Sequence, residues 1–452
     1  MKKMRKLAAI LLAVMMTVGL CATAWADGST TETTTTGNAI TDKGTVEVTT
    51  NPNQVTFKNV LKAYNPDETT IYAPAVTYSF TIQAADGTEH GIGTIVTDND
   101  TETPGTQAMV LSGAGGSITI GTETINYTVT NRPSITASLD YDMDDVLTAA
   151  AAGADNVQDV TVDFSNVQFS KPGIYRYLIT RTVTDNNEAL NTIDGTAATA
   201  GTTTYTSTRY LDVYVKENNG TRTIYGYVMH KVTTNINKDT PKSDSFDDEY
   251  KTSNLIVTKT LVNDASMNSH KFPFNVQFDD TKEAHIKTSN SVTGYSGGST
   301  VGTLAAGVKK DNPTIAHNGA VKYIGIPNGF TAEVYEENDV TGTTYKSNGN
   351  VVTSETGDTD AADKSITWRT GSTTTATSDG ETSTTTTAPA YRSNTAKTGA
   401  ATNQNKQADF TNTLEEISPT GVVLRVAPYV LMLAAGLMLL MLSRRRRTAL
   451  DD

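Results

Sequence analysis

Short stretches in which apolar and polar residues alternate recur along most of the chain. A first group contains VTFKNVL, VTYSFTI, INYTVT, VTVDF, YRYLIT, RYLDVYV and TIYGYVM, and a second group contains LIVTKTLV, FPFNVQF, AVKYIGI, FTAEVYE and ADFTNTL. Asn, Gly and Pro separate these stretches. Alternation with a period of two, interrupted by turn residues, is typical of antiparallel strands. We therefore expect an all-β chain with two tandem β-sandwich domains.

Polar segments of biased composition mark the domain boundaries. Residues 237–254 are polar and acidic and predict a join near residue 250, and residues 370–407 are rich in Thr, Ser, Gly and Ala, which predicts a mobile insertion before the last strand. The polar start of the mature chain predicts a flexible leader. The expected parts are the leader 27–45, the N-terminal sandwich 46–250 and the C-terminal sandwich 251–416.

Both ends of the chain carry apolar stretches with basic flanks. Residues 1–26 combine a basic start, an apolar run and a small-x-small end, the pattern of a secretory signal peptide. Residues 422–443 are apolar over a length that crosses a hydrocarbon core of about 30 Å. The basic tail 444–452 orients this transmembrane helix with its C-terminus in the cytoplasm. Both sandwiches are therefore expected outside the cell.

The segment before the apolar stretch resembles the sorting signal of Gram-positive surface proteins, usually written LPxTG. It reads Ile417, Ser418, Pro419, Thr420 and Gly421, so Ile and Ser hold the first two positions and Pro stands one place late. In that family a sortase cuts between Thr and Gly and joins the Thr carboxyl to an amine. The resemblance implies cleavage after Thr420 and loss of the helix from the mature protein. A single-pass membrane protein with a turn beside the membrane is the alternative.

The composition argues against several function classes. Of 36 basic and 49 acidic residues, nine basic and two acidic ones lie in 1–26 and 421–452, which leaves residues 27–420 with a net charge of −20. This charge disfavours nucleic acids and anionic membrane surfaces as partners. The one cysteine, Cys21, lies in the signal peptide, and the five histidines show no metal-ligand spacing. We expect no metal, cofactor, small-molecule substrate or enzymatic turnover.

A longer stretch resembles a known family. Residues 162–180, VDFSNVQFSKPGIYRYLIT, are similar to a signature of the streptococcal pilin isopeptide-linkage family, in which an apolar strand, Phe and Pro-Gly precede a Tyr-x-Tyr strand. The resemblance continues through RYLDVYV, FDDEYKTSNLIVTKTL and FTNTLEEISPTG. Family members are pilus backbone subunits built from immunoglobulin-like sandwiches. The resemblance implies that fold here, with an amide in each sandwich between a first-strand Lys and a last-strand Asn, assisted by a buried Glu or Asp.

The C-terminal sandwich holds all three groups that the resemblance calls for. Lys259 lies in its first strand, Asn412 lies in its last strand, and Glu336 shares one strand face with Ala332 and Val334. Burial lowers the pKa of an amine and raises that of a carboxyl, so the carboxyl can move the protons of the reaction. The resemblance implies a Lys259–Asn412 amide with Glu336 as the catalytic group. A solvated Lys259–Glu336 pair is the alternative.

The N-terminal sandwich departs from the family pattern. Lys58 in VTFKN stands at the lysine position, Asp248 in FDDEY stands at the Asn position, and Arg181 replaces the catalytic acid. An arginine stays charged and cannot shuttle protons. A Lys58–Asp248 amide, formed with loss of water, is therefore the less favoured interpretation. An ion pair or two unrelated surface residues are favoured.

Polymerisation requires an acceptor amine for Thr420. In the family this amine belongs to an exposed lysine a few residues before the final strand of the N-terminal domain. Lys242 lies four residues before Phe246 on a polar stretch, with Lys238 and Lys251 as rivals. The resemblance implies a Lys242–Thr420 amide between subunits.

Together these features predict a structural pilus shaft subunit. The subunit is expected to be exported as a membrane-anchored precursor, polymerised with identical subunits by a sortase, and attached to peptidoglycan at the cell-wall surface. A wall-anchored adhesin or minor pilin that binds a host or matrix ligand is the alternative. The shaft is favoured because two sandwiches and a sorting signal account for almost the whole chain.

Overall fold

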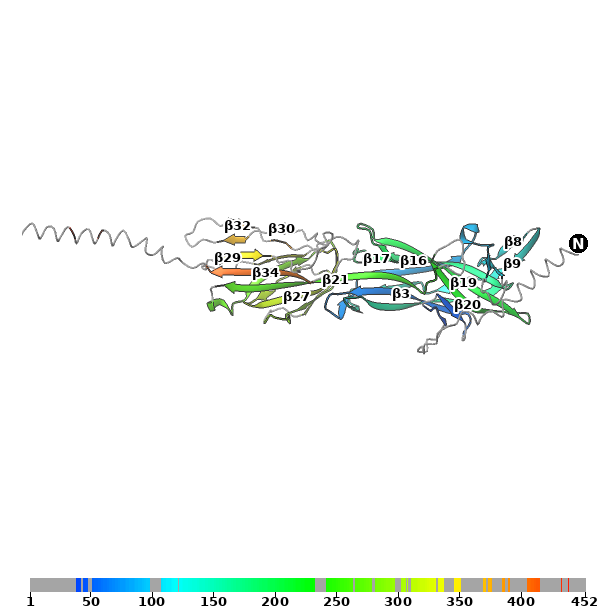
Figure 1. Cartoon of the computed structure of the whole chain (residues 1–452), viewed down its shortest axis with the longest axis horizontal. Helices are drawn as coiled ribbons and strands as arrows, with labels where there is room; N and C mark the ends of the chain where they lie inside the picture. The colour runs from blue at the N-terminus through cyan, green and yellow to red at the C-terminus, as the bar shows by residue number, and fades with distance from the viewer. Residues whose placement is uncertain are drawn as a thin grey trace, which may run out of the picture.

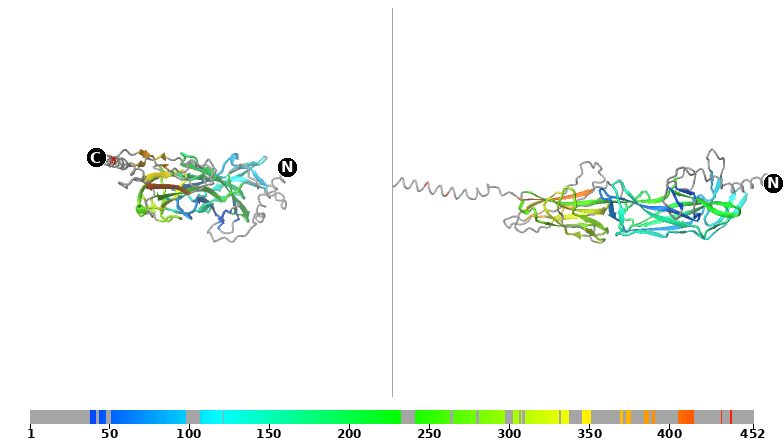
Figure 2. Two further views of the ribbon diagram at one scale, coloured as in Figure 1. Left: turned by 60° about the vertical axis from the view of Figure 1, so that its left-hand side comes forward. Right: turned by 90° about the horizontal axis from the view of Figure 1, so that it is seen from below.

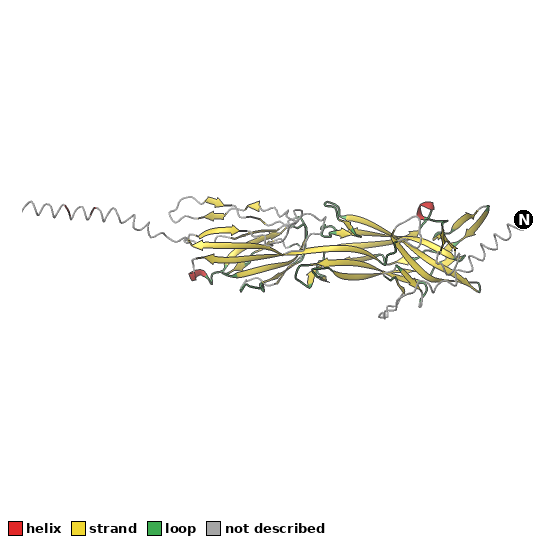
Figure 3. Cartoon of the chain, in the orientation of Figure 1, coloured by secondary structure: helices red, strands yellow, loops and turns green. Residues whose placement is uncertain are grey.

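The computed structural model is an elongated molecule in which two β-sandwiches lie end to end (Figures 1 and 3). The expected all-β class is confirmed. Apart from Met432 and Met438, the helical residues among those described belong to two single turns, η1 Thr88–His90 and η2 Ala265–Met267. The structure describes residues 38–41, 44–47, 51–97, 107–120, 122–231, 241–262, 265–278, 281–296, 302–305, 307, 310–330, 332–336, 345–350, 369–370, 373–375, 384–386, 389–390, 405–414, 432 and 438.

Several predicted segments fall outside these ranges. They are the signal peptide, the sorting motif 417–421, the basic tail and all of the apolar stretch 422–443 except Met432 and Met438. Within the described ranges, no helix has the length and apolar character needed to cross a membrane.

The N-terminal sandwich packs two sheets around one core. The first sheet has the order β11-β14-β3-β21, and the second has the order β12-β5-β16-β19-β20-β2 with β7 beside β16. Phe57 of the first sheet packs edge-on against Phe80 of the second, with ring centroids 6.1 Å apart. The main strands are β2 Thr45–Glu47, β3 Gln54–Tyr64, β5 Val76–Ala84, β7 Gln107–Ser112, β11 Ser134–Ile135, β12 Ser138–Tyr141, β14 Ala154–Asp163, β16 Gly173–Thr184, β19 Thr204–Asn218 and β20 Thr221–Lys231.

Short strands pair at the edges and loops of this sandwich. They are β1 Asn38–Ala39, β4 Thr70–Tyr72, β6 Ile95–Thr97, β8 Gly116–Ile120, β9 Glu123–Tyr127, β10 Val129–Thr130, β13 Val146–Thr148, β15 Gln168–Phe169, β17 Thr192–Ile193 and β18 Thr196–Ala197.

The C-terminal sandwich repeats the two-sheet plan. One sheet joins β21, β27, β23 and β24, with β34 and β29 on the other side of β21, and the second sheet places β22 between β28 and the pair β25 and β26. Its strands are β22 Phe272–Phe278, β23 Ile286–Ser289, β24 Gly302–Leu304, β25 Lys310–Asp311, β26 Thr314–Ile315, β27 Gly319–Pro327, β28 Ala332–Glu336, β29 Tyr345–Asn350 and β34 Asn405–Leu414. The predicted insertion 370–407 contains the second residue of β30 Arg369–Thr370, all of β31 Thr373–Thr375, β32 Thr384–Thr386 and β33 Pro389–Ala390, and the first three residues of β34; its other residues lie outside the described ranges.

One long strand belongs to both sandwiches. β21, Ser245–Val262, pairs in parallel with β3 through residues 245–251 and then with β27 and β34 through residues 252–262 (Figures 1 and 2). The join predicted near residue 250 is therefore continuous strand rather than a loop. A register shift between Ser253 and Leu255 changes which residues face inward, from even numbers before it to odd numbers after it. This bulge lets one strand serve two cores.

A buried polar network fixes the contact between the sandwiches. The side-chain amides of Asn65 and Asn254 bond to each other, and Asn254 also bonds to Asp67. Lys322 of β27 reaches back to Asp67 and Glu68 at 2.8 and 2.7 Å. Because both asparagines have no exposed surface, separating the sandwiches would leave buried polar groups without partners.

Candidate functional site

The core of the C-terminal sandwich contains a lysine amine. Lys259 follows the bulge of β21 and lies on the inward face with Val257 and Leu261, and its side chain has no exposed surface. Its Nζ lies 4.5 Å from the ring centroid of Phe272 on the opposite sheet. The amine is therefore shielded from water, with an aromatic ring packed against it.

The carboxylate of Glu336 meets this amine from the other sheet. β28 pairs with β22, which sets Glu336 opposite Phe274. Lys259 Nζ donates to both carboxylate oxygens of Glu336, at 2.9 and 2.7 Å. Burial lowers the pKa of Lys259 to about 8, and the charge of Glu336 only partly opposes this effect. Since only 9% of the Glu336 side chain is exposed, the alternative of a solvated pair is wrong.

The strand that carries Asn412 lies directly beside Lys259. β34 runs parallel to β21, with Phe410 opposite Lys259 and Asn412 opposite Leu261. Ala408 and Phe410 are core residues, so alternation assigns position 412 to the same face of the sheet. The side chain of Asn412 lies outside those that the structure describes. Its backbone position is two residues beyond Phe410, the partner of Lys259 on the neighbouring strand.

The structure separates Lys58 from Asp248. Lys58 lies on the outer face of β3, where 44% of its side chain is exposed and its Nζ is 3.8 Å from Asp244. The parallel register sets Lys58 opposite Ser245, whereas Asp248 is buried. The inward position of β3 is taken by the next residue, Asn59, which has no exposed surface. The alternation of VTFKN, with Val55 and Phe57 inward, is the signal that identifies Asn59.

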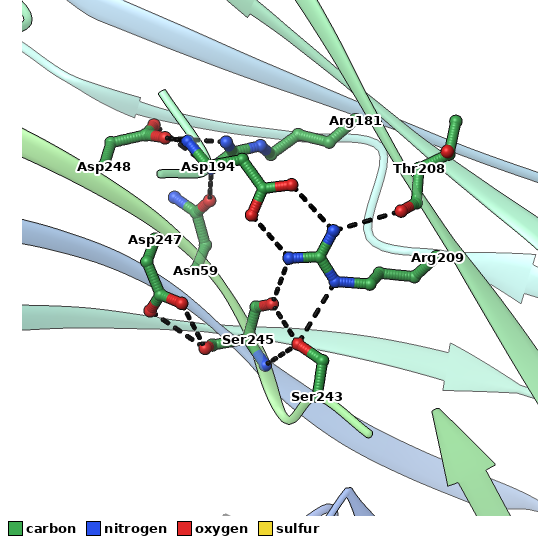
Figure 4. A network of polar contacts seen from close by, with 9 residues as sticks. All are labelled: Asn59, Arg181, Asp194, Thr208, Arg209, Ser243, Ser245, Asp247 and Asp248. Carbon is green, nitrogen blue, oxygen red and sulfur yellow. Dashed lines mark hydrogen bonds and ion pairs between the residues drawn. The ribbon is translucent and has the colours of Figure 1, made fainter. Parts of the chain in front are cut away.

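Asp248 binds Arg181 inside the N-terminal core (Figure 4). The guanidinium donates to both carboxylate oxygens at 2.7 and 3.1 Å, and it also donates to Asn59 Oδ1 at 2.8 Å. The backbone N–H of Asp194 also donates a hydrogen bond to Asp248 Oδ1 at 2.9 Å. Arg181 and Asp248 have no exposed side-chain surface. A non-covalent charge pair thus joins β16 to β21, and a hydrogen bond from the same guanidinium joins β3 to them.

The network extends towards the segment that precedes β21. Arg209 binds the Asp194 carboxylate through both of its terminal nitrogens, and its Nε donates to Ser243 Oγ at 3.1 Å. Its guanidinium also donates to the carbonyl oxygen of Ser245 at 2.9 Å. Figure 4 shows these contacts continuing from the Arg181 pair. The residues next to Lys242 are therefore anchored to the core.

The two sandwiches place their polar groups at equivalent registers. In the N-terminal sandwich Asn59 pairs with Phe246, and Asp248 lies two residues further on. In the C-terminal sandwich Lys259 pairs with Phe410, and Asn412 lies two residues further on. The opposing sheet contributes Arg181 in one case and Glu336 in the other. The same architectural position thus holds an Arg–Asp–Asn group in one domain and the Lys–Glu pair beside Asn412 in the other.

Lys242 lies beside the end of β20, to which a single-residue bridge connects it. It pairs with His230, flanked by hydrogen bonds from Lys231 N to Pro241 O at 3.2 Å and from Ser243 N to Met229 O at 3.1 Å. Its side chain is half-buried, and burial lowers its pKa. Of the two rival lysines, Lys238 lies outside the described residues and Lys251 forms an ion pair with Glu249 at 3.1 Å.

No protein-family model and no curated protein matches this sequence. Among solved structures, the chain is similar to the major pilin of Streptococcus pyogenes, with 14% identity over 80% of this chain and 99% of that chain and a TM-score of 0.38. The T3.2 major pilin of Streptococcus pyogenes shows 16% identity over 82% of this chain and 100% of that chain, with a TM-score of 0.37. The pilus-presented adhesin Cpa shows 18% identity over 46% of this chain and 37% of that chain, with a TM-score of 0.19. These likenesses identify no functional residue.

Proposed function

We propose that this chain is a structural pilus shaft subunit, stabilised by a Lys259–Asn412 amide and polymerised and attached to the cell wall by a sortase. One observation carries the proposal: the buried amine of Lys259, on the strand beside that of Asn412, meets a carboxylate of the opposite sheet at 2.7 Å. A buried ion pair contributes little to stability compared with apolar packing. A reaction between the amine of Lys259 and the carboxamide of Asn412 would account for a buried Lys259–Glu336 pair that stabilises the fold so little.

The proposed reaction is a single self-modification rather than turnover. Transfer of a proton from Lys259 to Glu336 leaves a neutral amine beside a protonated carboxyl. The amine nitrogen attacks the side-chain carbonyl carbon of Asn412, the bond to the amide nitrogen breaks, and Glu336 supplies the proton with which that nitrogen leaves as ammonia. Glu336 takes up the proton that the attacking amine loses. The fixed register of β21 and β34 supplies the proximity that makes the attack feasible.

The mass of the mature chain tests this proposal. We expect a deficit of roughly 17 Da, one ammonia, relative to the sequence. The variants Lys259→Met, Asn412→Ala and Glu336→Gln should each abolish the deficit. Glu333→Gln, at the alternate position of the same strand, is the matched control and should retain it. An unshifted mass in the unaltered chain would contradict the amide.

The proposed assembly uses Thr420 as the acyl donor and Lys242 as the acceptor. The motif at 417–421 and the position of Lys242 immediately before β21 support these assignments. Cell-wall extracts should contain a ladder of covalent multimers, which Lys242→Ala abolishes while monomers stay attached to the wall. Lys238→Ala and Lys251→Ala are the matched controls. A ladder that survives in Lys242→Ala would reassign the acceptor, and the absence of a ladder from the unaltered protein would favour the adhesin alternative.

A further inference from the structure

A second buried charge cluster lies on the outer face of the sheet that contains β16, β19 and β20. Tyr175 and Tyr177 of β16 point into the main core, so Arg176 between them points to the opposite face. Arg176, Asp212 and His230 have exposed fractions of 0%, 1% and 2%. The strand registers set Arg176 opposite Asp212, and His230 opposite Tyr210. Such burial of charged groups outside the main core is costly and requires an explanation.

Asp212 lies between the arginine and the histidine. Arg176 donates to its two carboxylate oxygens at 2.8 and 3.0 Å, and a third guanidinium nitrogen donates to the carbonyl oxygen of His90 at 2.7 Å. His230 Nε2 lies 3.4 Å from Asp212 Oδ2. The guanidinium and the imidazole together lower the pKa of Asp212 against the effect of its burial. Asp212 therefore stays ionised and favours a proton on the Nε2 atom of His230.

Neither imidazole nitrogen of His230 has a hydrogen-bond partner within the part of the chain that the structure describes. Nδ1 and Nε2 are both buried, and Nε2 has the ion-pair contact with Asp212 at 3.4 Å. Buried polar atoms in folded proteins almost always form a hydrogen bond, so a buried atom without one requires an explanation, such as a functional role. With the proton on Nε2, Nδ1 is an acceptor.

The neighbour of His230 across the bridge is Lys242. The hydrogen bonds of this bridge connect the flanking residues, so His230 and Lys242 form a non-hydrogen-bonded antiparallel pair. Side chains of such a pair lie on one face with Cβ atoms about 4.5–5.5 Å apart. Gly44 packs against the Cβ of Lys242 with a φ of +65°, and a Cβ at position 44 would clash there. The Cβ of Lys242 thus packs against the Gly44 turn, and its backbone is paired with that of His230.

We propose that His230 is the proton acceptor for Lys242 during subunit joining, and that Asp212 is its positioning residue. This inference rests on the proposed role of Lys242 as the acceptor amine. The amine nitrogen attacks the Thr420 carbonyl carbon of the acyl-enzyme, the bond from that carbon to the enzyme breaks, and an amide forms. The proton that the amine loses passes to His230 Nδ1, and from there to the departing enzyme group. The amine can thereby react without releasing its proton to bulk water.

The test compares polymerisation with wall attachment in cells that express the full chain and the pilus sortase. Wall attachment uses Thr420 without Lys242, so the ratio of multimers to wall-attached monomers reports on the acceptor alone. His230→Gln places an amide nitrogen near the Nε2 position, where it can still face Asp212, but it removes the Nδ1 acceptor. We expect this ratio to fall at least about tenfold, in keeping with the usual contribution of general base catalysis. His270→Gln in the other sandwich is the control and should leave the ratio unchanged.

A pH series separates proton transfer from a structural role. Groups that face His230 are Asp212 and Tyr210 from β19, Lys242 from the bridge, Arg176 behind Asp212, and His90, whose Nδ1 pairs with the Tyr210 hydroxyl at 2.6 Å. Because the proposed proton transfer passes through Nδ1, the multimer ratio of the unaltered chain should depend on the pH of the medium, and His230→Gln should lose this dependence.

Each outcome decides one claim. If Lys242→Ala abolishes the ladder but His230→Gln polymerises at the unaltered rate, the acceptor stands and the role of His230 is refuted. If His230→Gln lowers the ratio with an unchanged pH dependence, its effect is structural and the proposal is also refuted. A ladder that persists in Lys242→Ala refutes the acceptor itself. Thermal unfolding of the His230→Gln chain, unchanged within a few degrees, would confirm that the fold is retained.

Discussion

The amine of Lys259 has a pKa near 8, which couples the stability of the C-terminal sandwich to pH wherever the amide is absent. An unfolded lysine has a pKa near 10.4. Between these two values the unfolded chain binds a proton that the folded chain does not. The free energy of unfolding therefore rises with pH across this window; the contribution of this group is unfavourable below about pH 10.4 and reaches its full size below about pH 8.

In Asn412→Ala, which cannot form the amide, we expect a gain of about 3 kcal/mol from this group between pH 8 and pH 10.5. Urea unfolding of Asn412→Ala and of Asn412→Ala with Lys259→Met, measured over this range, isolates the effect because all other groups are shared. A difference between the two variants that does not change with pH would contradict the lowered pKa. In the unaltered chain the amide removes the titrating amine, and the gain should vanish.

At the scale of strands, the alternation of inward-facing and outward-facing residues determines which site residues the sequence can predict. Lys259 and Glu336 were predictable because Val257 and Val334, two residues away, fix their inward phase. The same rule applied to β3 predicts that Asn59 faces the core and that Lys58 does not. The family pattern, which expects a lysine at this site, leads to Lys58 instead. The bulge at Ser253 and the continuity of β21 were not predictable, since the polar residues of this stretch resemble a linker until their burial is known.

The Arg181 group provides the element-scale prediction. Arg181→Met leaves Asp248 buried without its counter-charge, which should lower the free energy of unfolding of the N-terminal sandwich by about 3–5 kcal/mol. Replacing both partners, Arg181→Met with Asp248→Leu, should cost much less because no charge is stranded. Lys58→Met, which removes an exposed pair, should change stability by about 1 kcal/mol or less. Chemical denaturation of the three variants measures these differences, and equal losses in the first two would contradict a paired-charge role.

At the scale of the whole molecule, β21 and the polar junction make the two sandwiches one rod. The strand crosses from one core to the other, and Lys322 binds Asp67 and Glu68 across the contact. His285 of the C-terminal sandwich also stacks on Tyr72 of the N-terminal one, with ring centroids 4.0 Å apart. Bending at the junction would break these contacts together, so the subunit is suited to transmitting tension along its long axis.

With Lys242 and Thr420 as the points of attachment, the proposed amide defines a short covalent path for that tension. The path follows the chain from Lys242 to Lys259, crosses to Asn412 and leaves at Thr420, so it includes neither residues 260–411 nor any residue before Lys242. The N-terminal sandwich is carried by β21 without bearing the load, which explains why a non-covalent Arg181–Asp248 pair suffices there.

Pili pulled end to end in a single-molecule instrument should therefore show no unfolding step. In Asn412→Ala pili, residues 260–411 enter the path, and each subunit should unravel by roughly 500 Å, at about 3.4 Å per residue. Steps of that length in pili of the unaltered chain would show that the load does not pass through the amide.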